Sequence, residues 1–234
     1  MIKQNKALKS CYDFWQIHNT KKGYPEDYPD EEVVRFLMRL KSNTIKKKKK
    51  IKDIKILDLA TGSGKNIQPI MDIGFKLYCI DWSKGGLNYI KQKYKNKNIH
   101  FTWLDFVNSK LLYNDNYFDA VIATSVFDHI LKKDCEKLLS EVHRVTKKNG
   151  LMISNLMTTK TNKKSRVGIK IQGEKNTYLV ETGNSAGEIH SLFEKKKAKK
   201  FFSKYFITNE TVDYKITFNE KYNLNILYSS LKKK

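Results

Sequence analysis

The fold of this chain is decided by the stretch Ile56-Leu-Asp-Leu-Ala-Thr-Gly-Ser-Gly-Lys-Asn66. It is a short apolar run that breaks into glycines, which is typical of a buried parallel strand followed by a tight turn. Gly62 and Gly64 let the backbone turn sharply and approach a ligand closely. Asp81 ends the next apolar run, at the place where an α/β sheet holds the two hydroxyls of a ribose. The pattern therefore predicts a nucleoside-containing ligand at this turn.

Two familiar nucleotide loops fit this stretch poorly. A Walker phosphate loop needs Gly and then Ser or Thr at the positions held by Leu59 and Asn66, so that interpretation fails. The dinucleotide fingerprint fits only in part, because Ile67 stands where its third Gly is expected. A different nucleoside-binding family has to be considered.

The string Asp58-x-x-x-Gly62-x-Gly64-x-Asn66 resembles motif I of the class I S-adenosylmethionine (SAM) methyltransferases. That family usually has Gly at the position of Ala60, a residue small enough to leave the turn possible. The resemblance covers roughly residues 54–157. It implies an α/β fold with a doubly wound, Rossmann-like, seven-stranded mixed sheet, and SAM as the cofactor.

The resemblance also implies which residues hold the methionine part of SAM. Asp58 would orient the methionine end, and the turn from Ala60 through Gly62 to Gly64 would approach it closely. Thr124 and Ser125, which end a later strand, would lie along the same moiety.

The nucleoside part is assigned in the same way. Asp81 would accept hydrogen bonds from the ribose hydroxyls, with Trp82 beside the adenine. Asp105 would take the adenine amino group, and Phe106 would pack on the ring. These landmarks follow one another at successive strand ends, which is more specific than any one of them alone.

Composition bounds the remaining possibilities. At 234 residues, with 40% hydrophobic residues, the chain is predicted to form a single folded domain, residues 1–234. No run is long enough for a membrane span, and the start Met1-Ile-Lys-Gln lacks an apolar signal segment, so we expect a cytoplasmic protein. The three cysteines are unevenly spaced and form no CxxC pair, which favours reduced thiols over a disulfide frame or a zinc site.

The formal charge of +22 raises the question of a nucleic-acid partner. Of 46 basic residues only four are arginines, although bidentate phosphate recognition favours Arg over Lys. Lys, Asn and Ile all have A/T-rich codons, so much of the charge is explained by genomic composition. Nucleic acid stays the less favoured partner, and a small-molecule acceptor the favoured one.

Apolar runs and helical periods alternate through the centre of the chain. Strands are predicted at 54–59, 75–80, 98–104, 118–124 and 151–157. Helices are predicted between the glycine turn and Gly74, after a Ser83 cap, and from an Asp134 cap to Asn149-Gly150. This alternation predicts a doubly wound parallel sheet that binds ligands at the carboxyl ends of its strands.

The two ends of the chain depart from the alternation. Residues 1–45 combine an aromatic segment, either a lid over the ligands or a segment packed on the domain, with a helix that follows Asp30. Residues 51–157 would form the SAM-binding core. Residues 158–206 would hold a hairpin of 167–171 with 178–181 and a basic helix near 193–205, on the acceptor side. Residues 207–234 would close the sheet with an antiparallel pair.

Methyl transfer needs a nucleophile held in line with the methyl group, and a base only where the acceptor must lose a proton. His129, in Val126-Phe-Asp-His129-Ile, could be that base or could only hydrogen-bond its loop. His190 is the second catalytic candidate, because it lies where related enzymes build the acceptor pocket. His100 and His143 lie in regular elements, and the histidines show no metal-ligand spacing, so no metal is expected.

The leading hypothesis is a SAM-dependent methyltransferase that acts on a small polar metabolite, such as a sugar or a surface-glycan building block. The sugar rests on a loose similarity of the region from Gly23-Tyr-Pro25 to Arg35-Phe-Leu37 to such enzymes. An RNA methyltransferase and a SAM-binding regulator without catalysis are the alternatives. The oligomeric state cannot be read from the sequence.

Overall fold

The core is a mixed sheet whose strand order is β3-β2-β1-β4-β5-β10-β9 in the computed structural model, which describes residues 1–19, 28–95, 97–161, 168–218 and 222–234. The strands are β1 Lys55–Leu59, β2 Lys76–Asp81, β3 Ile99–Trp103, β4 Phe118–Ala123, β5 Thr146–Met157, β9 Phe206–Phe218 and β10 Tyr222–Lys233. β1 to β5 run parallel, and β10 pairs antiparallel with both β5 and β9. The predicted seven-stranded mixed sheet is confirmed.

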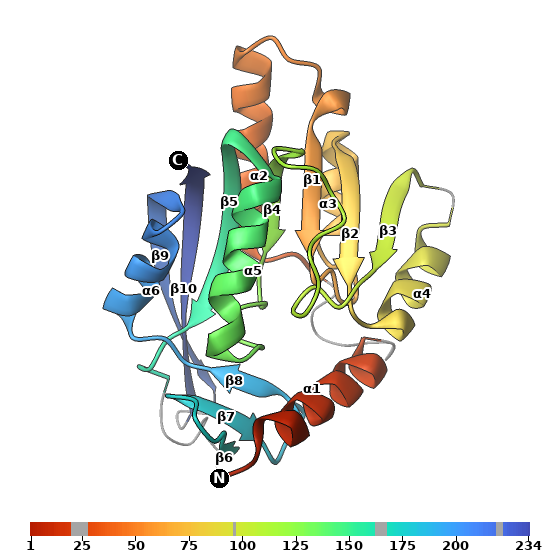
Figure 1. Ribbon diagram of the computed structural model, residues 1–234. Coiled ribbons are helices and arrows are strands. Elements are labelled where there is room, and N and C mark those ends of the chain that lie inside the picture. Colours follow the sequence, from red (N-terminus) through yellow and green to blue (C-terminus); the bar gives the residue numbers. More distant parts are fainter. Residues whose placement is uncertain (20–27, 96, 162–167, 219–221) are drawn as a thin grey trace.

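Helices cover both faces of this sheet (Figure 1). They are α2 Glu31–Lys46, α3 Ile67–Ile73 and α4 Lys84–Lys93 on one face, with the short helix η1 Ile51–Asp53 before β1, and α5 Lys132–Val145 and α6 Lys195–Ser203 on the other. Side chains of β1 alternate between the two cores: Ile56 packs with α2, α3 and α4, and Leu57 packs with α5. This alternation is what the period of two in a strand requires when both faces are buried.

Local signals set two of the helix ends as predicted. The Ser83 hydroxyl accepts a hydrogen bond from Gly86 N at 3.0 Å and caps α4. Gly74 ends α3 with φ 91°, a left-handed conformation that favours glycine.

The predicted ends of α5 were wrong at both termini. The helix begins at Lys132, so Asp134 lies in its first turn, where a carboxylate still suits the helix dipole. It ends at Val145 because Thr146 has extended backbone and enters β5. Asn149-Gly150 forms a turn within that strand: Asn149 has φ 61°, and a Cβ on Gly150 would lie 2.7 Å from the Lys147 carbonyl oxygen.

A second, three-stranded sheet is built from β6 Gly168–Lys170, β7 Thr177–Val180 and β8 Ile189–Ser191. The β6–β7 hairpin agrees with the prediction, although Val167 lies outside the described residues, and β8 was not predicted. This small sheet and α1 Gln4–His18 lie together at the edge toward which β1 and β2 point (Figure 1). Ala7 and Cys11 of α1 are buried in one cluster with Ile189 of β8.

Two further expectations from the sequence concern membrane-spanning helices and the cysteines. Among the described helices, none is long and apolar enough to cross a membrane. Cys11, Cys79 and Cys135 are buried free thiols, as predicted, and burial raises the pKa of Cys11 to about 12.

Candidate active site

A pocket opens at the carboxyl ends of β1, β2 and β4, where the sequence places the ligand. It encloses about 770 Å³ of space outside protein atoms, part of which is open to solvent. Its walls are formed by Trp15, His18, Asn19, Ala60, Thr61, Gly62, Ser63, Lys65, Asn66, Asp81, Trp82, Phe106, Thr124, Ser125, Val126, His129 and Ile130. Most of the residues predicted to hold the cofactor therefore share one pocket.

The glycine turn forms the floor of this pocket. Ala60 and Gly62 have φ 56°, and Gly64 has φ 82°, so three alternate residues adopt the left-handed conformation. Ala60 occupies this conformation at the position where Gly is usual, and an L-residue there carries a conformational cost. Gly64 lies behind the turn, where an added Cβ would stand 2.9 Å from side-chain atoms of Ile67 and Ile90.

Two buried carboxylates hold the turn in place. Asp58 accepts hydrogen bonds from the Thr61 hydroxyl at 2.7 Å and the Asn66 amide at 3.2 Å, and it does not line the pocket. Burial raises the pKa of Asp58 to about 6, and those two hydrogen bonds oppose the rise. Asp58 thus shapes the turn from behind.

Asp81 faces the pocket itself. Its carboxylate accepts hydrogen bonds from Gly62 N at 2.8 Å and Ser83 N at 2.7 Å. Burial raises the pKa of Asp81 to about 6, and the amides of Ser83 and Gly62 oppose the rise. Asp81 thus lies at the pocket, at the end of β2, and its contact with ribose hydroxyls stays a prediction.

Two aromatic rings flank the same side of the pocket. The rings of Trp82 and Phe106 are stacked, with centroids 5.6 Å apart and an interplanar angle of 27°. Asp105 does not line the pocket: its carboxylate accepts from Val107 N and Asn108 N, at 3.2 and 3.1 Å. The predicted contact of Asp105 with an adenine amino group stays a prediction, in which this carboxylate would have to turn away from its own loop.

The end of β4 supplies the opposite wall. Thr124 and Ser125 both line the pocket, as the sequence predicts for residues along the methionine moiety. Ser125 has φ 54°, and its N–H donates to the Asn155 side chain at 2.5 Å. A side chain from β5 therefore fixes this second left-handed turn.

Helix α1 covers part of the pocket. Its residues Trp15 and His18 line the cavity, together with Asn19 just after it. The Gln16 side chain joins α1 to the segment that follows β2. Its amide donates to the Trp82 carbonyl at 3.1 Å, and its oxygen accepts from Lys84 N at 3.1 Å. The N-terminal segment thus both packs on the domain and contributes to the pocket, whereas Gly23-Tyr24-Pro25 lies outside the described residues.

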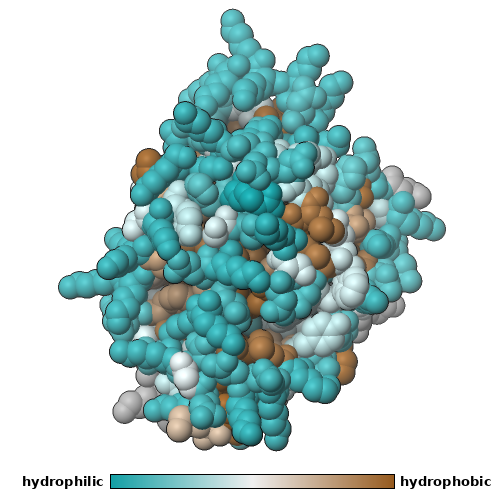
Figure 2. All heavy atoms as spheres, in the orientation of Figure 1, coloured by the Kyte–Doolittle hydropathy of each residue, from teal (hydrophilic) through white to brown (hydrophobic). Residues whose placement is uncertain are grey.

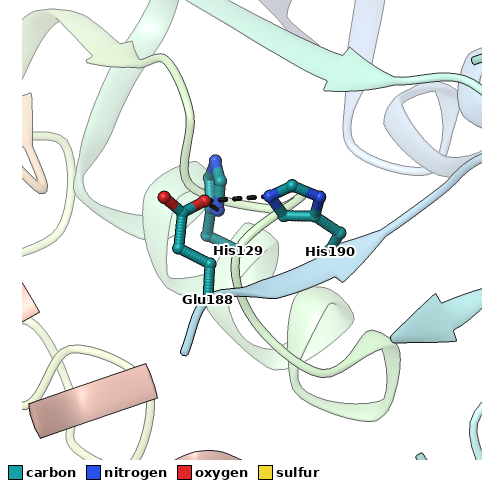
Figure 3. Close-up of side chains that lie close together, drawn as sticks. All are labelled: His129, Glu188 and His190. Carbon is teal, nitrogen blue, oxygen red and sulfur yellow. Dashed lines mark hydrogen bonds and ion pairs between the residues drawn. The ribbon is translucent and has the colours of Figure 1, made fainter. Parts of the chain in front are cut away.

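The two catalytic candidates, His129 and His190, meet beside the pocket around a third residue, Glu188 (Figure 3). Glu188 Oε2 lies 2.9 Å from His190 Nε2 and 3.3 Å from His129 Nδ1. Burial by itself raises the pKa of Glu188, but the hydrogen bond from His190 and the charges of both histidines bring it below its ordinary value. Of the three, only His129 lines the pocket.

Sequence reasoning did not assign a role to Glu188. It stands in the segment Gly187-Glu-Ile-His190, directly before β8, and the side chains of Glu188 and His190 both point toward His129. The signal available was the spacing of Glu188 and His190, which lets alternate side chains share one face of a strand. His100 and His143 lie in β3 and α5, away from this cluster.

These features match the chemical groups of SAM. The pocket offers a buried carboxylate for a diol, a pair of stacked rings for a base, and a turn whose backbone approaches the cavity closely. Asp81, Trp82, Phe106 and the turn at Gly62 are the residues that would hold such a cofactor.

Residues 57–154 match the family model described as "Methyltransferase domain". A ubiquinone biosynthesis O-methyltransferase of Pelagibacter ubique is 26% identical over 104 residues, 44% of this chain and 42% of that protein. A demethylmenaquinone methyltransferase of Paenarthrobacter aurescens is 33% identical over 99 residues, 42% of this chain and 37% of that protein. The chain thus spans about two fifths of the length of these curated relatives.

Solved structures share the fold over nearly the whole chain. The N-methyltransferase NodS of Bradyrhizobium japonicum, in complex with S-adenosylhomocysteine, superposes with a TM-score of 0.64 at 10% identity. The match covers 95% of this chain and 97% of that one. At this identity the match shows the fold alone.

Proposed function

We propose that this chain, which belongs to the class I SAM-dependent methyltransferase family, binds SAM in the pocket above the glycine turn and transfers its methyl group to a small polar acceptor. The observation that carries the proposal is the buried Asp81 carboxylate, which faces the pocket while it holds the glycine turn through Gly62 N. A ribose diol donates hydrogen bonds to such a carboxylate, and the rings of Trp82 and Phe106 lie next to it.

SAM, when bound, supplies an activated methyl group on a sulfonium leaving group. The protein's part is to hold the acceptor atom in line with that group and to exclude water. Thr124 and Ser125 line the wall next to the turn, and Trp15 and His18 of α1 close the cavity from the other side. An acceptor would therefore enter between the end of β4 and α1.

One wall of the pocket, formed by α1, the loop at His129 and the segment of Glu188 and His190, is here called the acceptor wall. It carries the groups that could remove a proton. His129 lines the pocket, and Glu188 holds both histidines through its buried carboxylate. We propose that this cluster orients the acceptor and helps its nucleophilic atom lose a proton where one must leave. His129 would meet the acceptor, and Glu188 and His190 would position His129.

The class of the acceptor is a narrower proposal. The names of both curated relatives point to quinone-related small molecules, and the apolar wall of Trp15, Val126 and Ile130 suits an aromatic ring with one polar edge. The sugar expected from the sequence remains a second candidate, supported only by the similarity in the region 23–37. We favour the aromatic acceptor because Trp15, Val126 and Ile130 line the pocket with apolar surface.

An RNA acceptor draws its support from the net charge of +22. Figure 2 shows hydrophilic side chains over most of one face of the molecule. This alternative predicts RNA affinity that falls steeply with salt, together with RNA-dependent methyl transfer. The regulator alternative predicts SAM binding with no transfer to any acceptor.

Transfer of labelled methyl from SAM tests the function. Purified protein is incubated with methyl-labelled SAM and three acceptor pools: phenolic quinone precursors, nucleotide sugars and total RNA. We expect label in the first pool, and loss of the label with His129→Ala. Label that appears only in RNA, or in no pool despite SAM binding, would contradict the proposal.

A further inference from the structure

Three side chains from two separate segments of the chain present their donor atoms to one another beside the pocket. His129 follows β4, whereas Glu188 and His190 come from the end of the small sheet (Figure 3). Their ligand atoms, Nδ1 or Nε2 of each ring and a carboxylate oxygen, all lie within 4.8 Å of one another. The set of two imidazoles and one carboxylate is common to catalytic zinc sites and non-haem iron sites.

We propose that His129, Glu188 and His190 bind one divalent transition-metal ion of the Zn²⁺ class. In a tetrahedral site with ligands about 2.0–2.1 Å from the ion, neighbouring ligand atoms stand about 3.3 Å apart. Glu188 Oε2 is already 3.3 Å from His129 Nδ1 and 2.9 Å from His190 Nε2. The ligand atoms of His129 and His190 lie within 4.8 Å of each other, so the two rings would move closer together around the ion.

Two buried polar atoms without hydrogen bonds support the assignment. His129 Nδ1 is buried and makes no hydrogen bond, even though a carboxylate oxygen lies 3.3 Å away. Asp128 Oδ1 is also buried without a hydrogen bond, and it lies 4.0 Å from the other ring nitrogen of His129. Buried polar atoms without hydrogen bonds are costly, and an imidazole nitrogen beside a carboxylate oxygen can be satisfied by a cation that both atoms bind.

An ion would satisfy the first of these atoms directly and would orient the ring of His129 toward the second. A metal on Nδ1 of His129 leaves the ring proton on Nε2, which faces the Asp128 carboxylate. Metal-bound histidines commonly donate their second N–H to a carboxylate, which fixes the ring and raises its basicity as a ligand. Asp128 would then be the outer partner of the ligand His129.

The surroundings are those of a shielded but accessible centre. Side chains of His129, Glu188 and His190 are 13%, 5% and 12% exposed. The Trp15 ring packs edge-on against His129, with centroids 5.4 Å apart, and closes one side. The protein supplies three ligands from the described residues, so further positions on the ion remain for water or an acceptor oxygen.

The inference deepens the proposed function, on which its catalytic meaning rests. As a metal ligand, His129 would no longer serve as the general base. An acceptor hydroxyl bound to the metal would lose its proton more readily, so that no separate base is needed. The ion would also fasten the small sheet to the loop that follows β4. The metal site itself does not depend on SAM binding.

Metal binding by the full chain tests the proposal directly. Metal-free protein is titrated with Co²⁺, followed by its visible absorption, and then with competing Zn²⁺. We expect one equivalent to bind with a Kd at or below the micromolar range, with the absorption of a low-coordinate nitrogen and oxygen site. Glu188→Gln, which keeps the shape of the side chain, and His190→Ala should each weaken binding at least 100-fold. The exposed His100 makes the matched control, and His100→Ala should bind as the wild type does.

Folding of every variant is checked by circular dichroism, and Glu188→Gln decides the question should His190→Ala fail to fold. Absence of saturable Co²⁺ or Zn²⁺ binding by the wild type, or unchanged affinity in Glu188→Gln, would overturn the metal site. SAM binding is measured separately on the same samples. Metal binding without SAM binding refutes the proposed function alone, and SAM binding without metal binding refutes the metal site alone.

Discussion

The two walls of the pocket are built in different ways. The cofactor wall comes from consecutive strand ends, β1, β2 and β4, with Asp81 hydrogen-bonded across the turn to Gly62 N at 2.8 Å. The acceptor wall joins parts that are distant in the chain: α1, the loop at His129, and β8 with Glu188 and His190. The first wall is set by the sheet topology, and the second by packing of an added sheet and helix onto it.

This difference separates binding from chemistry. Changes in the cofactor wall should alter SAM affinity, whereas changes in the acceptor wall should alter turnover while SAM affinity is kept. His129→Ala and Asp81→Asn test that separation on the two sides of the pocket.

His129→Ala should have the largest effect. Loss of a group that helps remove a proton typically costs roughly 10²–10⁴-fold in rate. Turnover should fall by about 100-fold or more, and SAM affinity should stay within about threefold of the wild type, measured with labelled SAM and an accepted acceptor. Unchanged turnover would remove His129 from the acceptor wall's chemistry.

Asp81→Asn should weaken SAM binding by roughly 10- to 100-fold, because a hydrogen bond to a charged group is worth about 1.5–3 kcal/mol. The measurement is the rise in melting temperature that SAM produces in each variant. Asp105→Asn is the matched control in the same half of the domain, since Asp105 does not line the pocket. An equal or larger loss in Asp105→Asn would restore its predicted contact with adenine.

Acid should weaken SAM binding through the same carboxyl. Burial raises the pKa of Asp81 to about 6, and only the ionised form accepts both ribose hydroxyls. SAM affinity should therefore fall about tenfold per pH unit below about pH 6, and Asp81→Asn should abolish this dependence. A wild-type affinity that is constant from pH 7 to pH 5 would contradict this role.

Folding stability should change with pH in the opposite sense to SAM affinity, so the two effects of acid can be told apart. The folded pKa values of Asp58 and Asp81 are raised from 3.8 to about 6. The folded state therefore binds protons more tightly, and these groups favour it increasingly as pH falls from about 6 toward 3.8. Loss of SAM affinity in that range would not come from unfolding driven by these two carboxyls.

Ala60→Gly should have the smallest effect. Ala60 and Gly62 share φ 56°, so Gly at position 60 relieves strain at the cost of a more flexible unfolded chain. We expect the free energy of unfolding in urea to rise by up to about 1 kcal/mol. Gly62→Ala is the matched control, because its Cβ would have no contact closer than 3.5 Å, and it should lose about 1 kcal/mol. A clear loss in Ala60→Gly would show that the left-handed conformation there is not strained.

The cofactor wall could be predicted because its signals are local. Each strand is a short apolar run that ends in a polar residue, so strand order along the chain places Asp81, Thr124 and Ser125 at one edge. The predicted ends of α5 are wrong because Asp134 and Asn149-Gly150 have the residue types of helix caps, whereas the helix begins before the first and the chain enters β5 before the second.

The acceptor wall could not be predicted in the same way. His129 and His190 were chosen singly as catalytic candidates, but their shared partner Glu188 depends on how β8 packs beside the loop after β4. No period or turn in residues 158–206 specifies that packing. For the same reason no sequence pattern indicates that three metal-ligand atoms meet there.

Calorimetric titration of the folded wild-type protein with SAM at pH 7.5 shows whether the pocket binds the whole cofactor, with adenosine and methionine as separate controls. We predict one saturable site per chain for SAM and far weaker binding of each fragment, because the proposed site would hold both ends of the molecule. Absence of SAM binding by a folded sample, or equal binding of adenosine alone, would contradict it.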